Sequence, residues 1–423
     1  MLTPYLYRLI YDNSLPRSGF MWEILAGCAV GVGMGVVSGL LPGIHVNTLA
    51  GIMLASQAVL LPLFGSGLLV AALIAALVTH CFLDAIPSTF LGVPDADTAV
   101  SVLPAHALCL EGRGEEAVRI AALGSAWGLV IGIPLCCILL LVMPALQPFL
   151  DWWTGIILVA VIGFLLARSE SPGWGLLVFL SSGALGAFAF RFSYLAPPSA
   201  GEGGVLMPLL SGLFGIAILI FAGQGPVPRQ TFRGISMEPG TIVRGSVLGA
   251  AAGTMVGWMP GLSNATANSV LVSAVDLASD RRGYLLATSA ANTVNAVVGL
   301  AAFFAISRTR NGVVAAMSIM EAPPLSTLLL VSAAAGLAAY LITVSMAGMA
   351  QMLAGFDRQA LNRVVMAFVA AVCLLVTGAF GMVILVLATA LGCVPRLVNV
   401  SQVYCMGAIT LPVMLYSFGV AWI

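Results

Sequence analysis

The chain has 423 residues, of which 61% are hydrophobic and only 8% are charged. This composition excludes an ordinary soluble globular domain. Its 16 cations are all arginines, balanced by 16 acidic residues, so the chain lacks the basic surplus that nucleic-acid binding needs. A spanning helix needs about 20 apolar residues, and the apolar segments therefore predict an all-α polytopic protein with roughly 11 to 14 transmembrane helices. We expect a multi-pass protein of the cell membrane, surrounded by the lipid bilayer.

The first predicted helix, 21–41, has a glycine at every fourth position. These glycines share one helical face: Gly27, Gly31, Gly35 and Gly39. Such a face lets another helix backbone approach closely. The helix ends at Pro42-Gly43, and a break of this kind frees backbone groups that lipid cannot satisfy. We therefore expect the break to lie inside protein or beside water.

A re-entrant hairpin is predicted in the first half of the chain. The segment 88–110 is apolar, but its prolines and two aspartates, Asp95 and Asp97, make it a poor straight span. A hairpin with its tip near 94–98 fits this pattern better, and a charged loop follows at 111–119. The remaining apolar segments of this half are expected to be helices over 47–64, 68–86, 120–150, 153–167, 173–190 and 204–223.

The pattern of the first helix recurs 218 positions later in the chain. The matching residues are Gly245, Gly249, Gly253, Gly257 and Pro260-Gly261. We interpret this as an internal duplication, with a first half at 1–223, a connecting loop at 224–244 and a second half at 245–423. Counting the first glycine helix, seven apolar segments precede the second one if the hairpin does not cross, which predicts the inverted repeat of many secondary transporters.

The second half has a corresponding set of elements. After its break come a short helix to about 278, a helix over 284–306 and a second hairpin at about 307–320. Further helices are expected over 325–353, 364–380, 382–392 and 403–420. We interpret the C-terminal part as scaffold, and a homodimer is one assembly that it could hold.

Three stretches of the first half are similar to a known family. They are Gly39-Leu40-Leu41-Pro42-Gly43, Leu91-Gly92-Val93-Pro94-Asp95-Ala96-Asp97-Thr98-Ala99 and Glu111-Gly112-Arg113-Gly114. The large membrane subunit of tripartite tricarboxylate transporters shows G-L-L-P-G, a V-P-G-D-A-A-A-like hairpin and a Q-G-K-G-like loop in this order. The second half resembles it at Pro260-Gly261, at Arg281-Arg282-Gly283 and around Asn292 and Asn295, where the family has a pair of asparagines.

This resemblance implies a transport protein, and in that family an extracytoplasmic binding protein and a small membrane subunit are partners. The chain departs from the family pattern at Asp95, which replaces a hairpin glycine, and at Arg308 and Arg310, which lie where a second V-P-G-x-G-like tip is usual. His45 and Asn47 stand where small residues are common. The departures leave the substrate and the need for these two partners open.

The two Pro-Gly breaks are the first candidate substrate site. Paired broken helices in corresponding halves mark the binding site of many transporters, and exposed amides at the amino ends of the following helices suit an anion or carboxylate. The alternative is that their side chains only cap helices. The candidate residues are Pro42, Gly43, His45, Asn47, Thr48, Pro260, Gly261, Ser263, Asn264 and Thr266, with Asn268 as a further hydrogen-bonding group.

Arg308 and Arg310 are a second candidate group. Charged side chains in an apolar hairpin cost at least about 2.5 kcal/mol each at mid-bilayer, so they are rarely idle. Three interpretations stay open: they bind an anionic substrate, they pair with Asp95 and Asp97, or they lie in a plain surface loop.

His80 and Asp84 lie four residues apart on one face of an apolar helix. Such a pair can relay protons, which makes it a candidate for coupling together with Asp95, Asp97, Asn292 and Asn295. Sodium held by carbonyl groups of the breaks is the rival coupling ion, and a purely structural pair is the third possibility. We expect no other cofactor and no metal centre, since the three histidines are scattered.

These features favour a secondary active transporter that moves a small organic anion by alternating access. A translocase for an anionic lipid such as polyprenyl phosphate is the alternative within transport, because arginine pairs suit phosphate. A non-transporting membrane subunit or an intramembrane enzyme are alternatives from other classes. For an enzyme, His80 and Asp84 lack a third catalytic member. We therefore expect a protein that is not an enzyme.

Overall fold

The computed structural model describes residues 18–41, 45–92, 102–197, 204–221, 228–275, 280–349 and 358–420. In these ranges the fold is entirely helical, as predicted. Before residue 222 the structure contains α2 (Ser18–Leu40), α3 (Val46–Ala55), α4 (Gln57–Leu83), α5 (Ala85–Leu91), α6 (Val102–Leu110), α7 (Gly114–Ala167), α8 (Pro172–Arg191), η1 (Ser193–Leu195), α9 (Leu206–Leu210), η3 (Ser211–Ile216) and α10 (Ala217–Phe221). After residue 227 it contains α11 (Pro239–Trp258), α12 (Asn264–Val275), α13 (Arg281–Ile306), α14 (Gly312–Ile319), α15 (Leu325–Met349), α16 (Arg358–Leu397), η6 (Gln402–Met406) and α17 (Gly407–Ser417).

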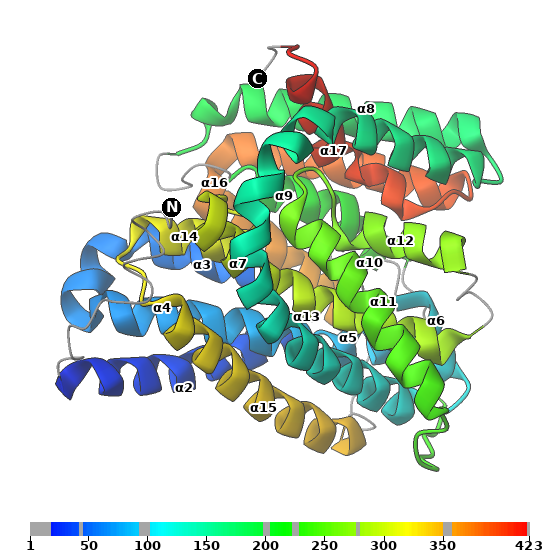
Figure 1. Ribbon diagram of the computed structural model, residues 1–423. Helices are drawn as coiled ribbons and strands as arrows, with labels where there is room; N and C mark the ends of the chain where they lie inside the picture. The colour runs from blue at the N-terminus through cyan, green and yellow to red at the C-terminus, as the bar shows by residue number, and fades with distance from the viewer. Residues whose placement is uncertain are drawn as a thin grey trace.

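Seven helical stretches of the described ranges are long and apolar enough to cross a membrane. They are α2, α4 together with α5, α7, α8, α13, α15 and most of α16. Three of them join segments that the sequence analysis separates. α4 continues from the predicted segment 47–64 into 68–86 and is kinked at Gly65, where φ is 73°. α7 has 54 residues and contains three prolines, and Figure 1 shows that it changes direction along its length. α16 has 40 residues and is kinked at Gly378, where φ is 64°.

Each glycine helix packs closely against the second helix after its break, α2 against α4 and α11 against α13. A Cβ on Gly31 would lie 2.2 Å from the carbonyl oxygen of Ala72, so only glycine lets α2 approach α4 this closely. A Cβ on Gly249 would lie 2.2 Å from the carbonyl oxygen of Ala287, which places α11 equally close to α13. The other glycines of both faces meet the same partner helices in order, so each pair runs parallel: Gly27 with Leu68, Gly35 with Ala76, Gly39 with Leu83, Gly253 with Ala291 and Gly257 with Asn295.

Helices α4 and α13 run antiparallel through the centre of the molecule (Figure 1). Leu77 shares a cavity wall with Ala296, and Ser88, which follows α4 in α5, shares another with Leu285. Residues with higher numbers on α4 and α5 therefore lie beside residues with lower numbers on α13. This reversed order, together with the two parallel glycine pairs, supports the inverted repeat, and the division into two halves stays a prediction.

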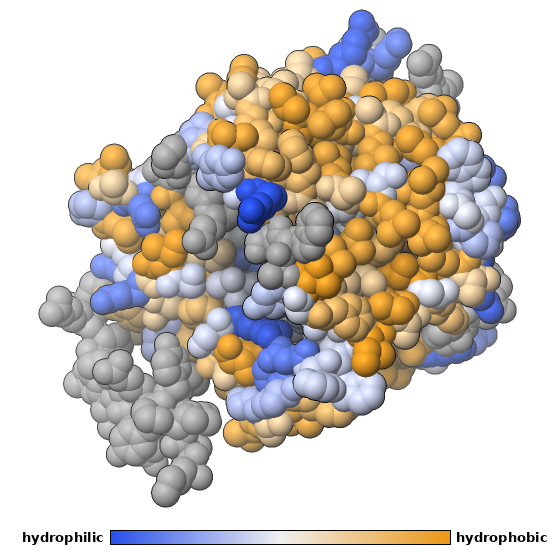
Figure 2. Space-filling model, turned by 90° about the horizontal axis from the view of Figure 1, so that it is seen from above, coloured by the Kyte–Doolittle hydropathy of each residue, from blue (hydrophilic) through white to orange (hydrophobic). Residues whose placement is uncertain are grey.

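Two large groups of buried side chains hold these helices together. The larger one lies between α3, α4, α7, α13, α14 and α15, and the other joins α8, α9, η3, α16, η6 and α17. Figure 2 shows hydrophobic side chains spread over much of the outer face, as expected where lipid replaces water. Polar residues that are buried between α4 and α13 therefore stand out, since each must find a partner within the protein.

Candidate functional site

The first break places two helix amino termini side by side. His45 is the N-cap of α3, and its Nδ1 accepts a hydrogen bond from the backbone N–H of Asn47 at 3.0 Å. The Oδ1 atom of Asn47 accepts one from the backbone N–H of Gly312, the first residue of α14, at 2.9 Å. Asn311 caps the same helix by accepting from the N–H of Val314 at 2.8 Å. The predicted capping is therefore present, and it joins α3 to a helix of the second half.

The polar face of α4 lies next to this junction. His80 is 3% exposed, and its Nδ1 is hydrogen-bonded to the hydroxyl of Ser38 at 3.1 Å. Its ring lies 4.9 Å from that of His45, edge to face. Asp84 follows one turn later, at the junction of α4 and α5, and is also buried. The structure thus brings His45, from the first break, against the His80 and Asp84 pair.

A chain of side-chain hydrogen bonds runs from Asp84 to the second break. The Nδ2 atom of Asn292 on α13 donates to Oδ2 of Asp84 at 3.2 Å. The Nδ2 atom of Asn264, the first residue of α12, donates to Oδ1 of Asn292 at 3.0 Å. All three side chains are at most 6% exposed. Residues 208 and 28 positions apart are therefore linked in one buried polar chain.

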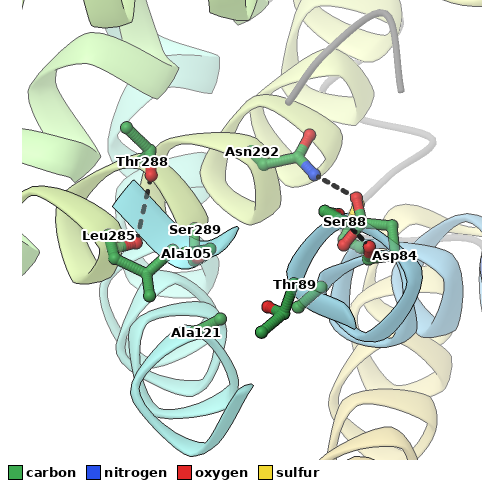
Figure 3. A pocket seen from close by; sticks show the side chains of 11 residues that line it. Asp84, Ser88, Thr89, Ala105, Ala121, Leu285, Thr288, Ser289 and Asn292 are labelled. Carbon is green, nitrogen blue, oxygen red and sulfur yellow. Dashed lines mark hydrogen bonds between the residues drawn. The ribbon is translucent and has the colours of Figure 1, made fainter. Parts of the chain in front are cut away.

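Two small cavities meet at this chain and share the residues Cys81, Asp84 and Asn292. The first, of about 20 Å³, lies between α5 and α13 and is shown in Figure 3. The second, of about 30 Å³, reaches the first break. Its lining consists of His45, Asn47, Leu77, His80, Cys81, Asp84, Asn292, Asn295, Ala296 and Asn311. Of the predicted site residues, six therefore gather around one cavity: His45, Asn47, His80, Asp84, Asn292 and Asn295.

The second break lies elsewhere in relation to these cavities. Gly261 has a φ of 78°, and its carbonyl oxygen accepts a hydrogen bond from Thr410 of α17 at 2.8 Å. Ser263 caps α12 by accepting from the N–H of Thr266 at 3.1 Å. Among the residues that the structure describes, Pro260, Gly261, Ser263 and Thr266 line neither cavity, and Asn264 reaches them only through Asn292.

The two arginines have different partners. Arg308 forms a salt bridge with Asp151 of α7, and both side chains are partly exposed. Arg310 instead donates through Nη2 to the carbonyl oxygens of Val256 and Met259, at the end of the second glycine helix. Within the described ranges, Nη1 of Arg308 and Nε of Arg310 have no acceptor, so each keeps one donor for a further group. Neither arginine lines either cavity.

Several predicted residues fall outside what the structure describes. Pro42, Gly43, Asp95 and Asp97 belong to this group, and of Thr48 only the backbone, in α3, is described. Pairing of the arginines with Asp95 and Asp97 therefore stays a prediction.

Some site residues were not singled out from the sequence. Ser38 lies one residue before the last glycine of its face and holds His80. Asn311 and the hydroxyl residues Ser88, Thr89, Thr288 and Ser289 line the cavities. A serine or threonine in a membrane helix usually bonds its own backbone, so the sequence gives little signal that these hydroxyl groups face a cavity.

Comparison with known proteins gives one family match that covers most of the chain. Residues 25–407 match the tripartite tricarboxylate transporter TctA family. The chain is also 30% identical over 297 residues to the uncharacterized protein MJ1079 of Methanocaldococcus jannaschii, an alignment that covers 69% of this chain and 72% of that protein. No solved structure matches the chain.

Proposed function

Because the chain belongs to the tripartite tricarboxylate transporter TctA family, we propose that it is a secondary active transporter of a small organic anion bearing carboxylate groups. The family is one of membrane transport proteins, and seven helical stretches here are suited to spanning a membrane. The finer proposal is alternating access in the cell membrane, with the substrate bound at the cavity that His45, Asn47 and Asn311 line.

The observation that carries this proposal is the meeting of two helix amino termini at that cavity. α3 and α14 begin beside each other, and Asn47 belongs to one helix while it caps the other. The N–H groups of Asn47, Gly312 and Val314 are already bonded within the protein, but the partial positive charge of the two helix amino ends still favours a carboxylate. The side chains of Asn295 and Asn311 add neutral hydrogen-bonding groups to the same wall.

The size of the cavity agrees with alternating access. A cavity of about 30 Å³ holds about two water molecules, which is too small for an organic anion. A substrate would therefore enter only after the helices around the cavity move apart. We propose that α3 and α14 move relative to α4 and α13, since the hydrogen bond between Asn47 and Gly312 links the first two helices.

Coupling and partners complete the proposal. Na⁺ or H⁺ would supply the driving force. An extracytoplasmic binding protein and a small membrane subunit, typical partners in this family, would deliver the substrate and complete the complex, and a homodimer is one assembly of it. For a lipid translocase, the arginine pair would need to face the cavity, whereas Arg308 holds Asp151 and Arg310 holds helix carbonyls. This arrangement favours the carboxylate over the lipid phosphate.

Uptake of radiolabelled citrate into proteoliposomes tests the proposal. We expect Asn47→Ala and Asn264→Ala each to reduce uptake by at least tenfold, since they remove the cap that joins α3 to α14 and the link to Asn292. Asn362→Ala is the matched control, because this buried asparagine of α16 lines neither cavity, and uptake should persist. Elution of each variant as the wild type does in gel filtration shows that the protein is folded.

Two results would contradict the proposal. The first is wild-type uptake by both folded asparagine variants. The second is thermal stabilisation of the purified protein by polyprenyl phosphate but not by di- or tricarboxylates, which would assign the site to a lipid headgroup.

A further inference from the structure

Six of the side chains around the cavity between α5 and α13 carry oxygen atoms, which the transported anion does not explain. Asp84, Ser88 and Thr89 lie on one side of it, and Thr288, Ser289 and Asn292 lie on the other (Figure 3). Its volume of about 20 Å³ accommodates a single ion or water molecule. Hydroxyl and carboxylate oxygens are the ligands that hard cations prefer. The chemistry of this wall is therefore opposite to that of the helix amino termini around the second cavity.

Among the described residues, the hydroxyl group of Thr89 in this wall has no hydrogen-bond partner. Thr89 is 1% exposed. Figure 3 shows this oxygen directed into the gap between α5 and the facing helices. A buried polar atom without a partner destabilises the folded protein, so a ligand that accepts its lone pair is favoured.

The carboxylate of Asp84 gives the same cavity a negative charge. It lies at the junction of α4 and α5, which form one continuous spanning stretch, and Asn292 is one of its hydrogen-bond partners. Asp84 also lines the second cavity. An anionic substrate placed there would be repelled by Asp84 unless a cation were bound close by.

We propose that the cavity between α5 and α13 binds one Na⁺ ion, with the Asp84 carboxylate, Thr89 Oγ1 and Ser289 Oγ as ligands. The ion neutralises Asp84 and thereby lets a carboxylate occupy the neighbouring cavity. Binding of the ion and of the substrate are then coupled through one shared side chain. This coupling role rests on the proposed function, whereas the ion site itself does not.

The test is Na⁺-dependent thermal stability of the detergent-purified full chain, without any organic anion. NaCl is titrated against choline chloride at constant ionic strength. We expect Na⁺ to raise the melting temperature of the wild type. Thr89→Val keeps the shape of the side chain but removes the ligand oxygen, and it should weaken apparent Na⁺ affinity by roughly tenfold or more.

Thr79→Val is the matched control. Thr79 is also fully buried, and its Oγ1 also has no partner in the described ranges, but it lines neither cavity and faces Gly35 of α2. This variant should keep the wild-type response to Na⁺. Ser289→Ala provides a second ligand variant if Thr89→Val does not fold.

The inference is overturned if NaCl and choline chloride stabilise the wild type equally, or if folded Thr89→Val and Ser289→Ala both respond to Na⁺ as the wild type does. Citrate uptake separates this result from the proposed function. Stabilisation by Na⁺ without citrate uptake would leave the ion site standing and remove the transport proposal. Uptake that continues when choline replaces Na⁺, together with no stabilisation by Na⁺, would support the transport proposal and remove the ion site.

Discussion

Arg308 and Arg310 lie two residues apart, but their surroundings differ in kind. The salt bridge of Arg308 with Asp151 is partly exposed, and such pairs contribute at most about 1 kcal/mol. Arg310 satisfies two backbone carbonyls at the end of α11, where the helix leaves its last acceptors without partners. Arg310 is therefore expected to contribute more than Arg308 to the free energy of unfolding.

We predict that Arg310→Gln lowers the free energy of unfolding by about 1–3 kcal/mol, because buried carbonyl groups lose their donor. Arg308→Gln should lower it by less than about 1 kcal/mol. Melting temperatures of the two purified variants, measured side by side, check this difference. Equal losses would show that the cap on α11 contributes no more than the partly exposed salt bridge.

Within a single helix, glycines that pack against a neighbouring helix can be distinguished from glycines that contact no other helix. On α2, a Cβ at Gly31 would lie 2.2 Å from the carbonyl oxygen of Ala72, whereas a Cβ at Gly33 would meet nothing within 4 Å. We predict that Gly31→Ala destabilises the protein by about 1–3 kcal/mol, since α2 must move away from α4. Gly33→Ala should be neutral or stabilising by up to about 1 kcal/mol, because alanine favours the helix.

Thermal melting of the two alanine variants in detergent provides the measurement. Gly249→Ala on α11 repeats the test in the second half, because the carbonyl oxygen of Ala287 lies equally close. A Gly31→Ala variant as stable as Gly33→Ala would mean that α2 and α4 separate without cost.

The sequence predicts these elements because their signals are local. Glycine spacing identified both packing faces, and the four-residue spacing of His80 and Asp84 placed them on one buried face of α4. The hydrogen-bond partners of His80 and Asp84 could not be predicted in this way. Ser38 and Asn292 lie 42 and 208 positions from the residues they bind, so no local pattern connects them. The sequence also suggested that the two breaks form one site, whereas the described part of the second break connects only through Asn264.

The lengths of the longest helices also could not be predicted from the sequence. Trp152 and Trp153 suggest a segment end, yet the structure continues α7 through both. A proline within a helix removes one hydrogen bond and bends the axis, and it need not end the helix where neighbouring helices support it. Counting apolar segments therefore divides α7 where the backbone is continuous.

At the scale of the whole molecule, the packing order fixes relative helix directions. α2 is parallel to α4, and α11 is parallel to α13, but α4 and α13 are antiparallel. The amino ends of α2 and α11 therefore lie at opposite ends of the bundle. α7 begins on the side of α11, because its Gly124 and Gly128 contact Leu286 and Ala290 in parallel order.

Several arginines lie at the end of the bundle where α11 begins. They lie near the amino ends of α7, α11 and α13: Arg113, Arg119, Arg244, Arg281 and Arg282. Since short cytoplasmic loops carry an excess of Arg and Lys, this side is predicted to be cytoplasmic. The amino end of α2 would then be extracytoplasmic, although the arginines before α2 favour the reverse.

Single cysteines resolve this conflict. Met21 in the first turn of α2 and Glu238 at the start of α11 are both exposed. In a background without the eight native cysteines, a membrane-impermeant maleimide should label Met21→Cys in intact cells. Glu238→Cys should be labelled only in inside-out vesicles. Labelling of both from one side would contradict the antiparallel arrangement of the halves. Labelling from opposite sides in the reversed sense would keep the inverted arrangement and show that the arginines before α2 determine the orientation.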